Sequence, residues 1–249
     1  MANGLAGDMG EVVGMLARIS RLGPVPAIGT GDTSVGMTLL SHLGIPYSSI
    51  EKPNFKGIVI TARRGTRARD LNRVNLFARV PDWDISSCKS SREIVARFGY
   101  DRDNGRKLYC TVRARKPNNQ GLMLVVDKGF SLVHEVHRSE EGVTTPVASW
   151  RLGGLLSKLE KSHGASIWVI AIPSKKDDAE YFHFRYATIT SAPKTTEFAS
   201  LIEQGTITMD HLIWEQSGRN VEKGPLFKIN PENVEALFPV SAKLDLLTL

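Results

Sequence analysis

The spacing of hydrophobic residues along the chain predicts several helices. Between Gly10 and Leu22, apolar residues recur every three or four positions, as in a helix with one face in a core. A second helix is expected to begin at Thr33 or Ser34 and to end at Leu43, because Gly44 and Pro46 stop helices. The other predicted helices are Ser90–Phe98, Trp150–Lys161, Thr195–Glu203 and Pro231–Phe238.

Short apolar runs between these helices predict strands. The β-branched run Gly57–Ala62 is typical of a buried strand, and we expect it to be central in its sheet. Leu108–Arg113, Leu122–Val126 and Leu132–Val136 are expected to form an antiparallel meander. Further strands are expected at Val74–Val80, Ile167–Ile172, Tyr181–Thr188, Thr206–Ile213 and Leu226–Ile229. Strands interleaved with helices predict a mixed α/β fold with one central sheet, in a single domain over residues 1–249, with two lobes as the alternative.

Composition excludes several classes of protein. With 249 residues, of which 41% are apolar and 23% charged, the chain can bury a full core. A disulfide-stapled miniprotein and a disordered chain are therefore excluded. The apolar run Ala165–Pro173 is far shorter than the ~20 residues of a membrane span, and no signal peptide is recognisable. The only thiols, Cys88 and Cys110, suit a reducing, cytoplasmic location, and no membrane partner is expected.

The net charge of +6 is concentrated after the predicted strand 57–62. Arginine carries a planar fork of donors that fits phosphate oxygens and guanine edges. We expect this segment to leave the sheet as a loop that contacts nucleic acid, with an ordinary solvated surface as the alternative. A second basic stretch runs from Arg102 to Lys116. The arginines of the first segment, which contains Asp70 as its only acid, are Arg63, Arg64, Arg67, Arg69, Arg73 and Arg79.

Motifs of catalysis are scarce in the sequence. His134 and His137 are three residues apart on a predicted strand, so they are expected to point to opposite faces and to be structural. Asp82 and Asp84 flank Trp83, which favours a turn over a catalytic carboxylate pair. The residues therefore offer no complete catalytic constellation.

The order of several segments carries a resemblance to a known family. These segments are Glu11–Leu16, Asp32–Ile45, Val74–Pro81, Arg97–Tyr100, Asn118–Leu124, Ser157–Lys161, Glu180–Phe184, Ser200–Asp210 and Lys223–Ile229. Together they resemble the type II restriction endonucleases of the MvaI/BcnI kind, within the PD-(D/E)xK nuclease superfamily. The resemblance implies a restriction-endonuclease-like central mixed sheet flanked by helices, with an additional antiparallel meander. It also implies double-stranded DNA as the partner, held in a basic cleft.

The resemblance further implies a metal site. In the family, a helix carboxylate, an Asp before the central strand and a Glu-x-Lys on that strand hold Mg²⁺ and activate water. The corresponding positions here are Leu40, Asn54, Val59 and Thr61. Asn54 offers at most a weak oxygen ligand, and no acid occurs between residues 52 and 69. We therefore expect no catalytic residue, metal or cofactor, with Leu40 and Val59 packed together as a hydrophobic plug.

Three functions remain open at this point. The favoured one is a degenerate nuclease that still binds DNA. The second is an active Mg²⁺-dependent nuclease whose acids have moved to Glu51, Asp70, Asp82 or Asp84. The third is a non-catalytic subunit that contacts another protein in a DNA-processing or defence complex.

The residues expected to contact DNA are the arginines of the 63–79 segment and Lys223. Two base-reading positions implied by the resemblance have changed, to Ala78 and to the segment 220–223. The target sequences of the family are therefore not assumed for this chain.

Overall fold

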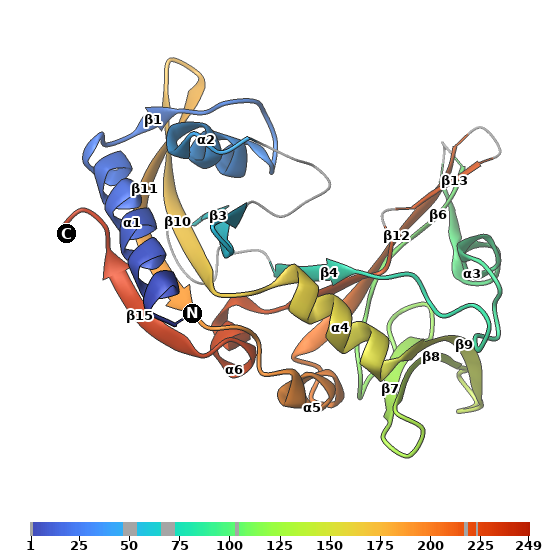
Figure 1. The fold of residues 1–249 in the computed structure, drawn as a ribbon. Helices are drawn as coiled ribbons and strands as arrows, with labels where there is room; N and C mark the ends of the chain where they lie inside the picture. Colours follow the sequence, from blue (N-terminus) through green and yellow to red (C-terminus); the bar gives the residue numbers. More distant parts are fainter. Residues whose placement is uncertain (1, 47–53, 66–72, 103–104, 217–218, 223) are drawn as a thin grey trace. The chain divides into compact units, whose positions relative to one another are not determined.

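The computed structural model describes residues 2–46, 54–65, 73–102, 105–216, 219–222 and 224–249 (Figure 1). The chain divides into two compact units. Unit 1 contains residues 1–72, 163–193 and 238–249, and unit 2 contains residues 73–162 and 194–237. Each unit is therefore closed by contacts between stretches that are far apart in the sequence.

Unit 1 is built around a six-stranded mixed sheet. The strand order is β1-β11-β10-β3-β2, and β15 also pairs with β11. β3 and β10 are parallel, with Thr61 beside Trp168, whereas the other pairs are antiparallel. The strands are β1 (Val25–Pro26), β2 (Asn54–Phe55), β3 (Ile58–Arg64), β10 (Ser166–Lys176), β11 (Ala179–Thr190) and β15 (Val240–Asp245).

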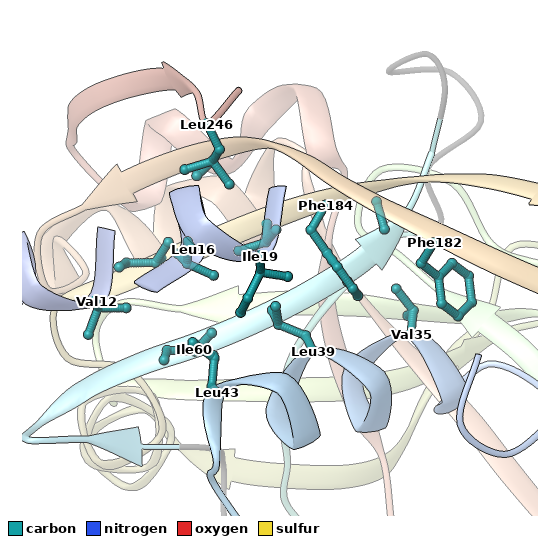
Figure 2. Close-up of a cluster of buried hydrophobic side chains, with 14 of the residues drawn as sticks. Val12, Leu16, Ile19, Val35, Leu39, Leu43, Ile60, Phe182, Phe184 and Leu246 are labelled. Carbon is teal, nitrogen blue, oxygen red and sulfur yellow. The ribbon is translucent and has the colours of Figure 1, made fainter. Parts of the chain in front are cut away.

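Helices α1 (Ala2–Arg21) and α2 (Ser34–Leu43) bury their apolar stripes against this sheet (Figure 2). Burial of each large apolar side chain stabilises the fold by about 2 kcal/mol. α2 ends at Gly44, whose φ of 69° is left-handed and suits glycine. The core cluster includes Val12, Leu16, Ile19, Val35, Leu39, Leu43, Ile60, Phe182, Phe184 and Leu246.

Unit 2 contains two antiparallel sheets. The larger has the order β4-β14-β12-β6-β5, with β13 paired to β12, and the smaller is the meander β7-β8-β9. The larger sheet is made of β4 (Val74–Ala78), β5 (Tyr100–Arg102), β6 (Gly105–Val112), β12 (Ile207–Gln216), β13 (Arg219–Glu222) and β14 (Leu226–Ile229). The meander is made of β7 (Leu122–Asp127), β8 (Leu132–Arg138) and β9 (Thr144–Arg151).

Unit 2 also contains the helices α3 (Ser91–Phe98), α4 (Leu152–Ser162), α5 (Phe198–Glu203) and α6 (Val234–Leu237). The Ser90 hydroxyl accepts a hydrogen bond from the Glu93 N–H and so caps α3. Short 3₁₀ turns, Thr195–Glu197 and Pro231–Asn233, precede α5 and α6. In the core, the ring centres of Phe77 and Phe227 are 5.2 Å apart.

The mixed α/β class predicted from the sequence is confirmed, and the strand at 57–62 is buried as expected. The mixed sheet of unit 1 and the meander β7-β8-β9 agree with the expected mixed sheet and additional meander, and the described strands form one further antiparallel sheet that was not predicted. β3 is also not central: β10 covers one edge, and on the other edge β2 pairs only with Ile58 and Val59. The number of sheets and the place of β3 in its sheet depend on pairing between strands that are far apart in the sequence. A run of hydrophobic residues does not show which strands pair.

Three local predictions also need correction. The strand predicted at 108–113 belongs to the larger sheet of unit 2, and the meander consists of β7, β8 and β9 instead. Trp150 lies in β9, so α4 begins at Leu152. Arg63 and Arg64 are the last residues of β3 and not the start of a loop.

No helix among the described residues is long and apolar enough to cross a membrane.

Candidate functional site

The alternation of side chains along β3 separates two sets of residues. Ile60 faces α1 and α2 in the core cluster. Val59, Thr61 and Arg63 alternate with it and so lie on the opposite face. The Arg63 guanidinium carbon is there 5.9 Å from the ring centre of Trp168 on β10. The two strand positions that the resemblance assigns to Glu and Lys therefore share one face with an arginine.

The side chains at these positions do not suit a divalent cation. Leu40 is 2% exposed and Val59 is 5% exposed, and neither has a ligand atom. Thr61 is half-buried and uncharged. The backbone of Asn54 pairs with Val59, and the Asn54 side chain lies outside the described part. Within that part, no group of three or more His, Cys, Asp or Glu residues could hold a metal ion.

Arg64 is held within unit 1 by several hydrogen bonds. Its Nε and Nη2 atoms each donate to an oxygen of Glu180 at 2.8 Å. Nη2 also donates to the Gly31 carbonyl at 2.7 Å and to the Ser34 hydroxyl at 2.6 Å. The hydrogen bond from Arg64 lowers the pKa of the Glu180 carboxyl. Arg64 thus joins the end of β3 to β11 and to the start of α2.

Arg63 has a different environment from Arg64. Its Nε and Nη1 atoms are buried, and neither has a hydrogen-bond partner among the described residues. Burial lowers the pKa of the Arg63 guanidinium. The residue as a whole keeps some exposure, so solvent reaches part of the side chain. The described contacts of the guanidinium are therefore with an aromatic ring and not with a counter-charge.

Arg73 belongs to a cluster of charges on the larger sheet of unit 2. Its Nη2 atom and the Nζ atom of Lys228 are each 2.9 Å from the same oxygen, Oδ2 of Asp210. The Thr111 hydroxyl donates to the other oxygen of Asp210 at 2.8 Å. Burial alone would raise the pKa of Asp210, but the hydrogen bonds from Lys228, Arg73 and Thr111 bring it below its ordinary value.

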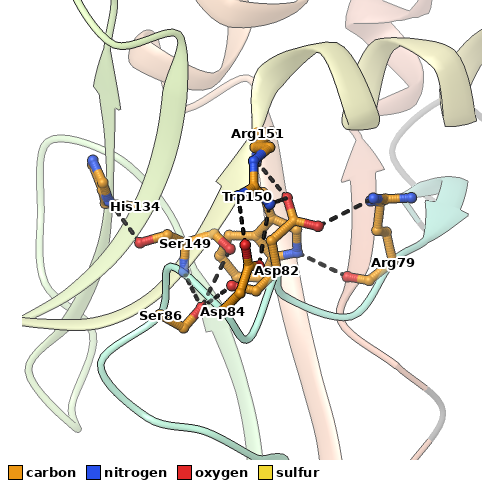
Figure 3. A network of polar contacts seen from close by, with 8 residues as sticks. All are labelled: Arg79, Asp82, Asp84, Ser86, His134, Ser149, Trp150 and Arg151. Carbon is orange, nitrogen blue, oxygen red and sulfur yellow. Dashed lines mark hydrogen bonds and ion pairs between the residues drawn. The ribbon is translucent and has the colours of Figure 1, made fainter.

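Arg79 and the segment Asp82–Asp84 form a second network in unit 2 (Figure 3). Arg79 Nη2 is 3.2 Å from one Asp82 oxygen, and the other oxygen accepts the Arg151 N–H at 2.7 Å. The Arg151 guanidinium binds Asp84 and lowers its pKa. The Ile85 N–H donates to the Asp82 carbonyl at 3.1 Å, so the predicted turn is present. Both carboxylates are thus engaged by arginines.

The loop between β6 and β7 lines a pocket of about 480 Å³ in unit 2. The basic stretch 102–116 contributes Arg113 and Lys116, whereas no binding role was predicted for the aromatic or amide residues of the wall. Cations, amides and exposed rings are the groups that bind phosphates and unpaired bases. The wall includes Tyr100, Tyr109, Arg113, Lys116, Asn118 and Asn119.

Some of the predicted site residues lie outside the described part of the chain. These are Arg67, Arg69 and Lys223 among the predicted DNA contacts, and Glu51 and Asp70 among the relocated acids. Glu180, Asp210 and Lys228, the partners in the Arg64 and Arg73 contacts, were not predicted from the sequence. They lie on strands far from the arginines in the sequence, and strand alternation was the only signal for their orientation.

Comparison with known proteins decides the family. The sequence matches the family model of the MvaI/BcnI restriction endonucleases over residues 13–238. This chain belongs to the MvaI/BcnI restriction endonuclease family. A search of curated protein sequences finds no match.

Two solved structures share the fold of this MvaI/BcnI family member. Restriction endonuclease MvaI in complex with its cognate DNA substrate is 17% identical, and the alignment covers 95% of this chain and 97% of that chain, with a TM-score of 0.79. MvaI in the absence of DNA is also 17% identical, with 94% and 96% of the two chains covered and a TM-score of 0.58. The likeness confirms the restriction-endonuclease-like fold expected from the sequence.

Proposed function

We propose that this protein binds double-stranded DNA and no longer cleaves it. The observation that carries the proposal is the burial of Leu40 and Val59, at 2% and 5% exposure, where the family resemblance places carboxylates. A hard divalent cation needs oxygen ligands, and two leucine- or valine-type side chains supply none. The Mg²⁺ implied by the resemblance therefore does not fit this face of β3, and no catalytic step is derived from it.

DNA binding is supported by the family and by the charge of the chain. The family fold occurs in MvaI, whose solved structure includes cognate DNA. The net charge of +6 favours a polyanionic partner. In this proposal, Arg63 and the pocket residues Arg113 and Lys116 contact the nucleic acid. Arg67, Arg69 and Lys223 stay in the proposal as predicted contacts, whereas Arg64, Arg73 and Arg79 are paired with acids and stabilise the fold.

A nuclease rebuilt around other acids is the second candidate. Asp82 and Asp84 are its described members, and both are bound by Arg79 or Arg151. A carboxylate that already accepts hydrogen bonds from arginine is a poor ligand for Mg²⁺, since the cation would have to displace the guanidinium. A non-catalytic subunit of a defence complex is compatible with the main proposal, because such a subunit could also bind DNA.

Incubation of the protein with supercoiled plasmid and either Mg²⁺ or Mn²⁺ tests the loss of cleavage. The expected result is no nicking above a buffer control at any protein concentration that shifts the plasmid in a gel. Cleavage that disappears in the Asp82→Asn variant would contradict the proposal and support the rebuilt site. If the protein does not shift duplex DNA in a gel at low salt, the proposed DNA binding is wrong. That result would favour a subunit that contacts another protein.

A further inference from the structure

We infer that the pocket beside the loop between β6 and β7 binds one unpaired nucleotide, with the base stacked on Tyr109 and the phosphate held by Arg113 and Lys116. The inference rests on the proposed function for its nucleic-acid ligand and names the form of nucleic acid that this pocket takes. An intact duplex does not offer that form, because the stacking of its base pairs covers both faces of each base. The nucleotide is free in solution or lies unpaired within a DNA strand, and both sources present the same base and phosphate.

The two tyrosines of the pocket lie on one face of the larger sheet of unit 2. Tyr100 on β5 is paired with Lys107 on β6, and Tyr109 is the next residue after Lys107 on that face. Residues in this diagonal relation are about 7–8 Å apart, and both tyrosines line the pocket. Tyr109 is 44% exposed, so part of its ring is open to a ligand. Exposed aromatic rings on a sheet are surfaces on which unpaired bases stack.

Neighbouring side chains restrict both tyrosine rings before a ligand binds. The ring centres of Tyr109 and Trp214 are 6.1 Å apart, and the ring planes meet edge to face at 83°. The guanidinium carbon of Arg102 is 5.2 Å from the ring centre of Tyr100. Rings that are already oriented lose little conformational entropy when a base stacks on them, which favours binding.

The loop that forms the other wall of the pocket is also ordered by its own hydrogen bonds. The Asn118 side-chain oxygen accepts the N–H groups of Gln120 and Leu122, each at 2.9 Å. The Asn118 side-chain nitrogen donates to the Thr111 carbonyl at 3.1 Å. Gly121 completes the turn with a φ of 74°, a left-handed conformation that favours glycine. A ligand therefore meets a wall that is formed in its absence.

The charges and amides of the wall select a nucleotide among small ligands. Arg113 and Lys116 are exposed, and the described residues that line the pocket include no Asp or Glu. Inorganic phosphate would engage these cations but not the rings, whereas an uncharged aromatic molecule would engage the rings but not the cations. The amides of Asn119 and Gln120 can donate to and accept from the edge of a base. The volume of about 480 Å³ lies within the roughly 300–1,000 Å³ of small-ligand pockets.

The first arm of the test measures affinity by fluorescence anisotropy in EDTA for three probes of the same sequence. One is a fully paired duplex, the second has one unpaired deoxyadenosine in one strand, and the third has an abasic site in place of that deoxyadenosine. We expect wild type to bind the second probe about tenfold more tightly than the other two, because only that probe offers a base to the pocket. The abasic probe keeps the bend and the charge of the bulge and so isolates the contribution of the base.

Variants of the pocket locate this preference. Tyr109→Ala should lose the preference of about tenfold, and Tyr109→Phe, which keeps the ring, should retain it. Phe130→Ala is the control, because it removes a ring that is 79% exposed in the same unit and lies outside the pocket. The double variant Arg113→Gln/Lys116→Gln should weaken binding of the bulged probe more than that of the paired duplex. This double variant replaces Tyr109→Ala if that variant does not fold.

The second arm measures the melting temperature with deoxyadenosine monophosphate, with inorganic phosphate and with chloride at equal ionic strength. A rise that requires both the mononucleotide and Tyr109 identifies a free nucleotide as a ligand. A preference for the bulged probe without such a rise identifies an unpaired nucleotide within a strand. Either result supports the inference.

The inference and the proposed function fail in different ways. If wild type binds all three probes equally and the mononucleotide has no effect, the inference is wrong and the proposed DNA binding stands. If wild type binds the unpaired deoxyadenosine through Tyr109 but does not bind the paired duplex, the inference holds and the proposed duplex binding is wrong. A preference that persists in Tyr109→Ala would place the base outside this pocket and overturn the inference. Binding of no probe and of no mononucleotide would overturn both.

Discussion

Arg63 and Arg64 are adjacent in β3, but their guanidinium groups lie on opposite faces of the sheet. Arg64 packs over the Phe182 ring at 5.0 Å and binds Glu180, whereas Arg63 lies beside Trp168. Two residues that look equivalent in the sequence are therefore unequal in their contacts. The guanidinium of Arg64 is paired with an acid, whereas two nitrogens of Arg63 are buried without a hydrogen-bond partner among the described residues.

The Arg64–Glu180 pair should contribute modestly to stability. Both side chains are partly exposed, at 26% and 31%, so Glu180→Gln is expected to lower the free energy of unfolding by about 1 kcal/mol. The lowered pKa of Glu180 makes this contribution present above about pH 4.3 and lost as the pH falls through the folded-state pKa. Urea denaturation at neutral pH checks the value. Glu160→Gln, at an exposed carboxylate on α4, is the control, and equal stability of the two variants would contradict the prediction.

Asp210 should contribute more to the free energy of unfolding than Glu180, because its carboxylate pairs with two cations. Asp210→Asn leaves Arg73 and Lys228 facing each other with no charge between them, and we expect a loss of about 2 kcal/mol in the free energy of unfolding. The lowered folded-state pKa means that the contribution is complete above about pH 4 and disappears at lower pH. Denaturation curves of wild type and variant should therefore converge in acid. A difference in the free energy of unfolding that stays constant at all pH values would show that the charge of Asp210 is not the source of the stabilisation.

The buried pair of His211 and Glu135 should stabilise the protein at low pH and lose this effect as the pH rises, opposite to Glu180 and Asp210. Both side chains are fully buried, and His211 Nε2 is 2.8 Å from Glu135 Oε1. Burial lowers the pKa of His211, but the charge and hydrogen bond of Glu135 more than compensate and raise it. This stabilisation is present below about pH 6.5 and is lost as the pH rises through the raised folded-state pKa.

The variant His211→Gln tests this dependence, since glutamine keeps an N–H donor but does not titrate. The free energy of unfolding of wild type should fall more steeply than that of the variant as the pH is raised from 6.5. Parallel curves, measured by urea denaturation, would show that His211 does not change its charge in this range.

The buried position of Val59 on β3 should reject a carboxylate, the side chain that the family resemblance predicts there. Val59→Glu is expected to lower the free energy of unfolding by about 3 kcal/mol, because a buried carboxylate loses its hydration without a cation beside it. Val59→Gln, which introduces a side chain of the same size as glutamate but without a charge, separates the loss of hydration of a carboxylate from steric change. If Val59→Glu is as stable as Val59→Gln at neutral pH, the buried charge carries no cost and the prediction is wrong. If Mn²⁺ stabilises Val59→Glu but not Val59→Gln, the site has kept a capacity for metal that the proposed function denies.

Elements with a complete local signal were predictable from the sequence. β14 was predicted with its observed bounds, Leu226–Ile229, and the stop of α2 at Gly44 was also correct. The two short strands β1 and β2 carry too few residues for a periodic pattern, and β15 was not recognised in the C-terminal segment. The assignment of strands to sheets depends on pairing, as between β3 and β10, and no local pattern reports it.

The candidate site was predictable only in part for the same reason. The assignment of Leu40 and Val59 to the carboxylate positions rests on the order of segments in the sequence and stays a prediction. The difference between Arg63 and Arg64 could not be predicted, because the predicted strand ended at Ala62 and left both arginines in a loop. Extending that strand by two residues would have placed them on opposite faces through alternation alone.

The discontinuous make-up of unit 1 has a consequence for how the protein is synthesised. α1, α2 and β3 are translated first, but β10 and β11 follow after the first stretch of unit 2, and β15 comes at residues 240–245. During translation, the apolar residues of α1, α2 and β3 therefore stay exposed until β10, β11 and finally β15 have been synthesised. Such high contact order slows folding and lengthens the time during which β3 can pair wrongly. We therefore expect release of this protein from the ribosome to depend on chaperones more than that of a chain of equal length with contiguous domains.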